Sequence, residues 1–150
     1  MDDIIKRNEN SLYRAAVAIM ANVACAEDVV QDVFLKLLEK KPKFENEQHE
    51  AAWLMRVTVN LCKTRLRAHW RKTSVPLLDV YPAVDDCQRN LIETVLALPA
   101  KYRIVIHLHY YEGYNTREIA QITGRKESTV RQHLTRARRM LKEFIEEEGL

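Results

Sequence analysis

Apolar residues recur at helical spacing along the first half of this chain, a pattern typical of helices with one buried face. The stripes occupy 11–22, 27–40 and 51–71 and predict three or four helices. The stripe residues are Leu12, Ala15, Ala16, Ile19 and Met20, then Val30, Val33, Phe34, Leu37 and Leu38, then Trp53, Leu54, Val57, Leu61 and Leu66.

Charges and a proline indicate where the second of these helices begins and ends. We expect Glu27 and Asp28 in its first turn and Lys40 in its last, where they would suit the helix dipole. Pro42 would end the helix, and a polar loop over 43–50 would follow.

The helical pattern stops over 73–87, which contains Pro76, Pro82 and several aspartates. We interpret this stretch as a linker between two small domains. The predicted fold is therefore all-α, with helical domains over 1–73 and 89–150 joined by a linker over 74–88. Composition agrees, because the 150 residues include only 3 glycines and 4 prolines.

Helical signals return in the second half. A leucine- and valine-rich stripe ends at Pro99, and an apolar helix over 102–111 is expected to end at Gly113. Asn115 and Glu118 can then form a capping box, in which each side chain accepts from the other's backbone N–H.

The last two predicted helices have the spacing of a helix-turn-helix. Ala120 is small enough for a helix crossing, Gly124 suits a tight turn, and Val130 can anchor a second helix that starts near Glu127 and runs to about Glu147. That helix would enter the DNA major groove, where arginine can pair with guanine and glutamine with adenine. Its inward positions would be Val130, Leu134, Ala137 and Leu141, and its outward positions Arg131, Gln132, Thr135, Arg136 and Arg139. An ordinary amphipathic hairpin is the alternative.

Charge is distributed unevenly along the chain. The net charge is +3, but lysine and arginine gather in 49–74 and 125–142, where acids are rare. Two such basic segments are typical of phosphate-binding surfaces, although solvated helix faces can look the same.

The residue types used in catalysis and metal binding are not arranged for either. Cys25, Cys62 and Cys87 are far apart and odd in number, which argues against a disulfide framework or a zinc site. His107 and His109 stand two apart on a predicted helix and would point in different directions. We expect no metal, no cofactor and no enzymatic activity.

The chain begins Met1-Asp2-Asp3, whereas a signal peptide begins with basic residues. Its apolar runs are shorter than the roughly 20 residues of a membrane span. We therefore expect a cytoplasmic protein without membrane insertion.

Three segments resemble sigma factors. "LPAKYRIVIHLHYYEGYNTREIAQITGRKESTVRQHLTRARRMLKEF", over 98–144, is similar to the fourth sigma domain. "ACAEDVVQDVFLKLL", over 24–38, resembles the second-domain helix that grips the polymerase clamp, and "AAWLMRVTVNLCKTRLRAHWRK", over 51–72, resembles the helix that opens and reads the −10 element. The order of these motifs, with no third domain between them, is similar to the extracytoplasmic-function (group IV) sigma factors of the sigma-70 family.

The resemblance implies a transcription initiation factor that binds core RNA polymerase through the β′ clamp helices and β flap and recognises −10 and −35 promoter elements. An anti-sigma factor that covers the inner faces of both domains is a further expected partner. The residues expected to bind polymerase are Asp28, Gln31, Asp32 and Leu35. Those expected at the −10 element are Asn60, Lys63, Arg65, Arg67, Trp70 and Arg71. Those expected at the −35 element are Thr116, Arg117, Lys126, Ser128, Thr129, Arg131, Gln132, Thr135, Arg136 and Arg139.

Two further features bear on the −10 element. The loop over 44–50 matches the family's loop that captures a flipped base. Many family members carry an acidic residue where this chain has Lys63 or Thr64, a departure that concerns the −10 sequence preference.

Two other functions remain open from sequence. A stand-alone helix-turn-helix regulator would work without polymerase and typically as a dimer on paired half-sites. An interaction module that sequesters a partner would have lost promoter reading altogether.

Overall fold

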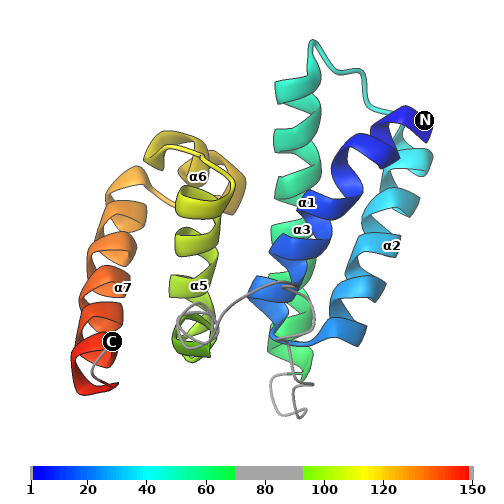
Figure 1. The fold of residues 1–150 in the computed structure, drawn as a ribbon. Coiled ribbons are helices and arrows are strands. Elements are labelled where there is room, and N and C mark those ends of the chain that lie inside the picture. Colours follow the sequence, from blue (N-terminus) through cyan, green and yellow to red (C-terminus); the bar gives the residue numbers. More distant parts are fainter. Residues whose placement is uncertain (1, 70–92, 149–150) are drawn as a thin grey trace.

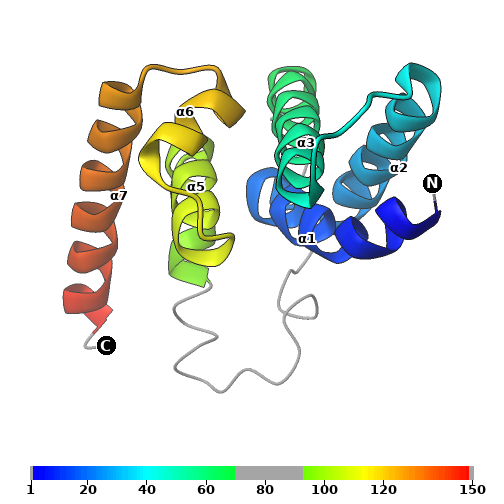
Figure 2. The same cartoon turned by 90° about the horizontal axis from the view of Figure 1, so that it is seen from above.

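The computed structural model describes residues 2–69 and 93–148, and every element in these residues is helical, as predicted. Figure 1 shows two helical bundles side by side, and the view from above in Figure 2 shows the same separation. The first bundle contains α1 (Asp2–Met20), α2 (Val23–Lys40) and α3 (Glu47–His69). The second contains α5 (Ala100–Ile106), η2 (His107–Tyr111), α6 (Thr116–Thr123) and α7 (Glu127–Glu148), preceded by a helical turn over 93–96.

The start of α2 differs from the prediction. Asn22 caps the helix, since its side-chain oxygen accepts from the backbone N–H of Cys25 at 2.9 Å, and the helix therefore begins at Val23. Glu27 and Asp28 consequently lie beyond the first turn, so their predicted role at the helix dipole is wrong. Lys40 does lie in the last turn, as predicted.

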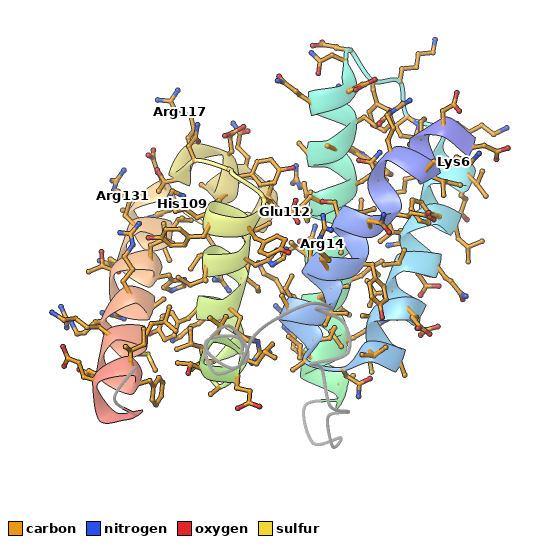
Figure 3. All side chains as sticks on the ribbon, in the orientation of Figure 1. Lys6, Arg14, His109, Glu112, Arg117 and Arg131 are labelled. Atoms are coloured by element: carbon orange, nitrogen blue, oxygen red, sulfur yellow. The ribbon has the colours of Figure 1, made fainter. Side chains whose placement is uncertain are left out.

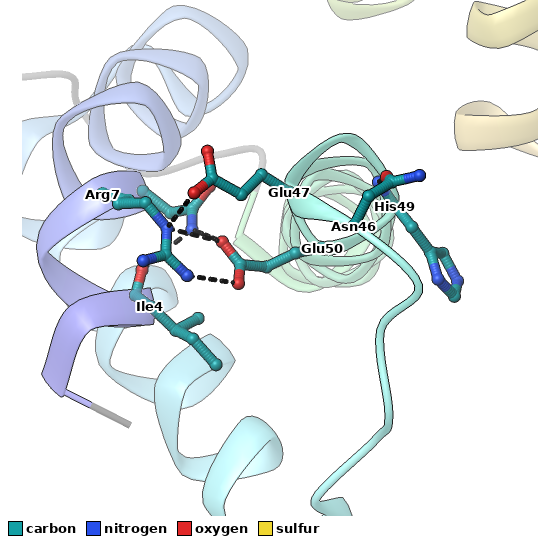
Figure 4. Close-up of polar contacts among 7 residues, drawn as sticks. Ile4, Arg7, Asn46, Glu47, His49 and Glu50 are labelled. Atoms are coloured by element: carbon teal, nitrogen blue, oxygen red, sulfur yellow. Dashed lines mark hydrogen bonds and ion pairs between the residues drawn. The ribbon is translucent and has the colours of Figure 1, made fainter.

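The start of α3 lies inside the predicted polar loop. Asn46 accepts from the backbone N–H of His49 at 2.8 Å, and the helix begins at Glu47. Glu50 is buried, and its carboxylate accepts from Arg7 Nη2 at 2.7 Å and from Asn8 Nδ2 at 2.9 Å (Figure 4). The hydrogen bond from Arg7 holds the pKa of the Glu50 carboxyl below its usual value, against the opposing effect of burial.

Most of the predicted core of α1 and part of that of α2 are confirmed. Leu12 and Ile19 are buried on α1, and Val33 and Leu37 on α2. Leu38, predicted to be buried, is 44% exposed.

The buried side of α3 is shifted from the predicted stripe. Leu54 is buried as expected, but Met55, Val59 and Cys62 are buried in place of the partly exposed Val57, Leu61 and Leu66. The reason is that α3 packs against α1, α2 and also α6 of the second bundle. A single apolar stripe does not describe a helix covered from several directions.

The predicted apolar helix over 102–111 consists of two parts. It begins at Ala100, directly after Pro99, and widens into a π-helix from His107. Gly113 follows with a positive φ of 79°, and the backbone N–H of Tyr114 donates to Leu108 O at 3.0 Å. The predicted end at Gly113 is therefore confirmed.

The two bundles share their interior. The buried apolar residues of both belong to one contiguous cluster, and α1 contacts α5 while α3 contacts α6. Among the described helices, none combines the length and apolarity of a membrane span.

Candidate nucleic-acid and partner interfaces

The turn between α6 and α7 has the predicted helix-turn-helix geometry. Asn115 Oδ1 accepts from the N–H of Glu118 at 2.8 Å, and Glu118 Oε1 accepts from the N–H of Asn115 at 3.0 Å, which completes the capping box. Gly124 has a φ of 71°, and its N–H donates to Ala120 O at 2.9 Å. These local bonds fix the direction in which α7 leaves the turn.

The predicted inner and outer faces of α7 are confirmed with one exception. Val130, Leu134 and Ala137 are buried, whereas Leu141 is only partly buried. The exposed predicted contacts are Arg117, Lys126, Ser128, Arg131, Gln132, Thr135, Arg136 and Arg139. Figure 3 shows Arg117 and Arg131 directed away from the helices. The helix-turn-helix thus presents a basic, hydrogen-bonding surface to solvent.

Two of the predicted DNA contacts are held by Glu127. Thr116 Oγ1 donates to Glu127 Oε1 at 3.0 Å and thereby joins the start of α6 to the first turn of α7. Arg131 Nη1 forms an ion pair with the same oxygen at 3.0 Å. Thr116 therefore acts as a positioning residue for the helix pair.

The predicted polymerase surface on α2 combines acids with exposed apolar groups. Asp28 and Gln31 are exposed, and Asp32 is partly buried. Leu35 is 60% exposed and lies on the same helix as the exposed Leu38. A surface of this kind suits a protein partner that has a basic rim and an apolar centre.

Arg65 connects two predicted surfaces. Its guanidinium forms an ion pair with Asp28 at 3.0 Å and a second ion pair with Asp32. The side chain expected at DNA is thus bound to two carboxylates expected at polymerase.

A hollow of about 190 Å³ lies between α2 and α3 beside Asn60. Its lining residues are Lys36, Lys40, Trp53, Val57, Asn60, Leu61 and Thr64. Trp53 is partly buried, and its ring lies 5.7 Å from that of Phe44. Trp53 therefore contributes both to the core and to the wall of the hollow, which pairs an aromatic face with two cations.

Lys63 is directed toward the second bundle. Its Nζ donates to Thr123 O, at the C-terminal end of α6, at 2.7 Å. Burial lowers the pKa of Lys63 to about 8, and the nearby charges of Arg125 and Arg67 add to this effect. Arg67 is exposed, and Trp70 and Arg71 lie outside the described residues.

Sequence reasoning did not identify Arg103. This residue of α5 donates to Ala18 O at 3.0 Å and Ile19 O at 2.5 Å, at the end of α1, and to Leu98 O at 2.7 Å in its own bundle. A lone arginine in an otherwise apolar run was the available signal, because such a side chain is buried only where several acceptors meet it.

The two histidines of η2 have separate partners. His107 Nε2 lies 3.1 Å from Glu112 Oε1, and His109 Nδ1 lies 3.0 Å from Tyr114 O. Glu112 also accepts from Ser11 of α1 at 2.7 Å. These groups serve packing within and between the bundles.

Comparison with protein families gives two matches. The family described as "Sigma-70 region 2" matches residues 4–72, and the family described as "Sigma-70, region 4" matches residues 88–141. The two matches fall on the first and second bundles in that order.

Individual relatives are similar over nearly the whole chain. The "ECF RNA polymerase sigma factor SigM" of Mycobacterium tuberculosis is 29% identical over 96% of this chain and 76% of its own length. The "ECF RNA polymerase sigma factor SigL" of the same species is 32% identical, over 93% of this chain and 85% of its own length. Among solved structures, the sigma factor RpoE of Bartonella quintana, crystallised with the anti-sigma factor NepR, matches with a TM-score of 0.77 at 26% identity and covers 91% of this chain and 90% of its own.

Proposed function

Because the chain belongs to the sigma-70 family of RNA polymerase sigma factors, in the extracytoplasmic-function group, we propose a residue-level division of its work in transcription initiation. The bundle of α1–α3 binds core polymerase and the −10 element. The bundle of α5–α7 binds the −35 element. The basic outer face of α7, held by a buried apolar inner face, is the observation that carries the proposal.

In the second bundle, α7 lies in the major groove. Arg136 and Gln132 are exposed along the outer face of the helix and contact base edges. The remaining polar and basic groups bind phosphates and set the register of the helix. These are Thr116, Arg117, Lys126, Ser128, Thr129, Arg131, Thr135 and Arg139.

In the first bundle, α2 docks on the polymerase clamp through Asp28, Gln31, Asp32 and Leu35. The −10 contacts come from Asn60, Lys63, Arg65 and Arg67 on α3, together with Trp70 and Arg71. The hollow beside Asn60 offers the aromatic and cationic groups that a single-stranded base prefers.

Partners and location follow from the same family membership. Sigma factors as a class are not enzymes, and in this proposal the polymerase supplies all the chemistry, so the chain works in the cytoplasm beside it. The related RpoE is bound to an anti-sigma factor, and we expect a protein of that class to bind this chain across the inner faces of both bundles.

A run-off transcription assay tests the proposal. Purified core polymerase is mixed with a genomic fragment library, with and without this protein. We expect defined start sites only with the protein, each preceded by two shared elements. Core binding without transcripts would indicate a sequestering relative, and the lack of core binding would indicate a stand-alone regulator.

A substitution on α7 tests the reading helix. Arg136→Ala should weaken binding of polymerase holoenzyme to the −35 element by about 1–3 kcal/mol, because a bidentate base contact is lost. Arg138→Ala is the matched control, since Arg138 is on the same helix but donates to Tyr110 Oη. The measurement is promoter affinity by fluorescence anisotropy. Equal losses in both variants would contradict the assignment of Arg136.

A further inference from the structure

The surface between the two bundles, which we call the seam, is held by groups from both sides. Arg103 of α5 binds the last carbonyls of α1, and Ser11 of α1 donates to Glu112. Arg14 of α1 lies over the ring of Tyr111, at 5.5 Å from the ring centre. Figure 3 shows Arg14 and Glu112 facing each other between the bundles.

The seam also covers part of the proposed −10 surface. Lys63 is bound to Thr123 O, beside the turn of the helix-turn-helix. α3 and α6 are therefore in direct contact, and a proposed DNA-contacting amine is bound to a protein carbonyl. In this arrangement Lys63 is not available to a phosphate or a base.

The arrangement is too compact for a promoter. The −10 and −35 positions are about 25 base pairs apart, which is about 85 Å of duplex at about 3.4 Å per base pair. The 22 residues of α7 span only about 33 Å at about 1.5 Å per residue. Bundles that touch cannot place α3 and α7 on both elements at once, so initiation requires that they separate.

We infer that the seam holds the free protein in a closed, self-inhibited state, which must open before the chain binds promoter DNA. This inference rests on the proposed function for the positions of the two elements. The polar character of the seam fits an interface that opens, because polar interfaces between domains of one chain usually permit relative motion. Arg14 Nε is buried without a hydrogen-bond partner, so closure leaves one donor unsatisfied.

Arg14→Glu tests the inference. The new carboxylate would face Glu112, and repulsion should open the seam without touching a proposed DNA contact. Lys6→Glu is the matched control, because it makes the same charge change on the exposed far end of α1 (Figure 3). Ser11→Asp is a second opening variant, which places a carboxylate beside Glu112 by a different route. Circular dichroism checks that each variant remains helical.

Two readouts apply to the full chain without polymerase. Small-angle X-ray scattering should give a radius of gyration near the roughly 15 Å of a compact chain of this length for the wild type and Lys6→Glu, and a clearly larger value for both opening variants. Affinity for a promoter duplex with a single-stranded −10 segment should rise at least about 3-fold in the opening variants over Lys6→Glu. An extended wild type, or open variants with no gain in DNA affinity, would overturn the inference.

Run-off transcription with saturating core polymerase separates this inference from the proposed function. Wild type, Arg14→Glu and Lys6→Glu should initiate equally, because polymerase holds the bundles apart. Transcripts from an extended wild type would reject only the closed state. A compact wild type that gives no transcript with any of the three proteins would reject the proposed function, and the self-inhibition with it.

Discussion

Arg65 binds acids on the neighbouring helix although it was expected to contact DNA. Its ion pairs with Asp28 and Asp32 join α3 to α2 across the first bundle. Both carboxylates are expected at the polymerase clamp, so the free protein already occupies groups that its partner would use. Polymerase must displace Arg65, and the displaced guanidinium would then be free for the DNA backbone.

Removing this side chain should therefore strengthen polymerase binding. Arg65→Ala frees both carboxylates, and because pairs this exposed contribute about 0.2–1 kcal/mol, core affinity should rise by up to about 5-fold. Arg67→Ala, an exposed arginine on the same helix, is the control and should leave core affinity unchanged. Competition with a labelled sigma factor for core polymerase measures the effect. A loss of core affinity in Arg65→Ala would refute this account.

Asn22 and Glu50 mark the limits of residue patterns in this chain. Acids near a helix start suggested that α2 begins at Glu27, but the capping side chain of Asn22 sets the start at Val23. Glu50 reads as a loop residue because charged groups are usually exposed. Its burial depends on Arg7, which is 43 residues away in the chain, so no local pattern contained it.

The helices differ in how well their patterns predicted them. α6 and α7 were predicted almost completely, because their capping box, turn glycine and apolar anchors all act within a few residues of each other. The buried side of α3 was not, because α6 of the other bundle covers part of it. Arg103 was missed for the same reason, since its acceptors belong to another helix.

Gly124 provides a test of the turn between α6 and α7. An added Cβ would meet nothing within 4 Å, so the cost of Gly124→Ala comes from the backbone, whose φ of 71° is strained for L-residues. We expect a loss of about 1–2 kcal/mol in the free energy of unfolding. Gly124→Asn should lose less, because asparagine tolerates this conformation. Chemical denaturation compares the two variants, and equal losses would mean that the turn is not limited by φ.

The closed arrangement of the whole chain should depend on pH through Lys63. Burial and the charges of Arg125 and Arg67 lower its pKa to about 8 from 10.5, so its ammonium is disfavoured when the bundles pack together. The penalty is fully present below about pH 8 and is relieved as pH rises toward 10.5. Closure should therefore become more favourable with rising pH.

This dependence is best measured in Arg14→Glu, where both forms should be populated. Its radius of gyration should fall between pH 7 and pH 9.5, and adding Lys63→Met should abolish that fall, because the titrating amine is gone. Adding Lys6→Met instead should leave the fall intact. A fall that persists without Lys63 would assign the dependence to another group.

The seam joins two parts of one polypeptide, and this distinguishes it from the interface with any separate inhibitor. Its occupancy does not change when the protein is diluted, whereas a complex of two chains dissociates as concentration falls. Only a molecule that binds the open form more tightly than the closed form can shift the balance, by as much as that difference in affinity. A cell that makes more of this protein would therefore raise the amount of the open form in proportion and leave its fraction unchanged.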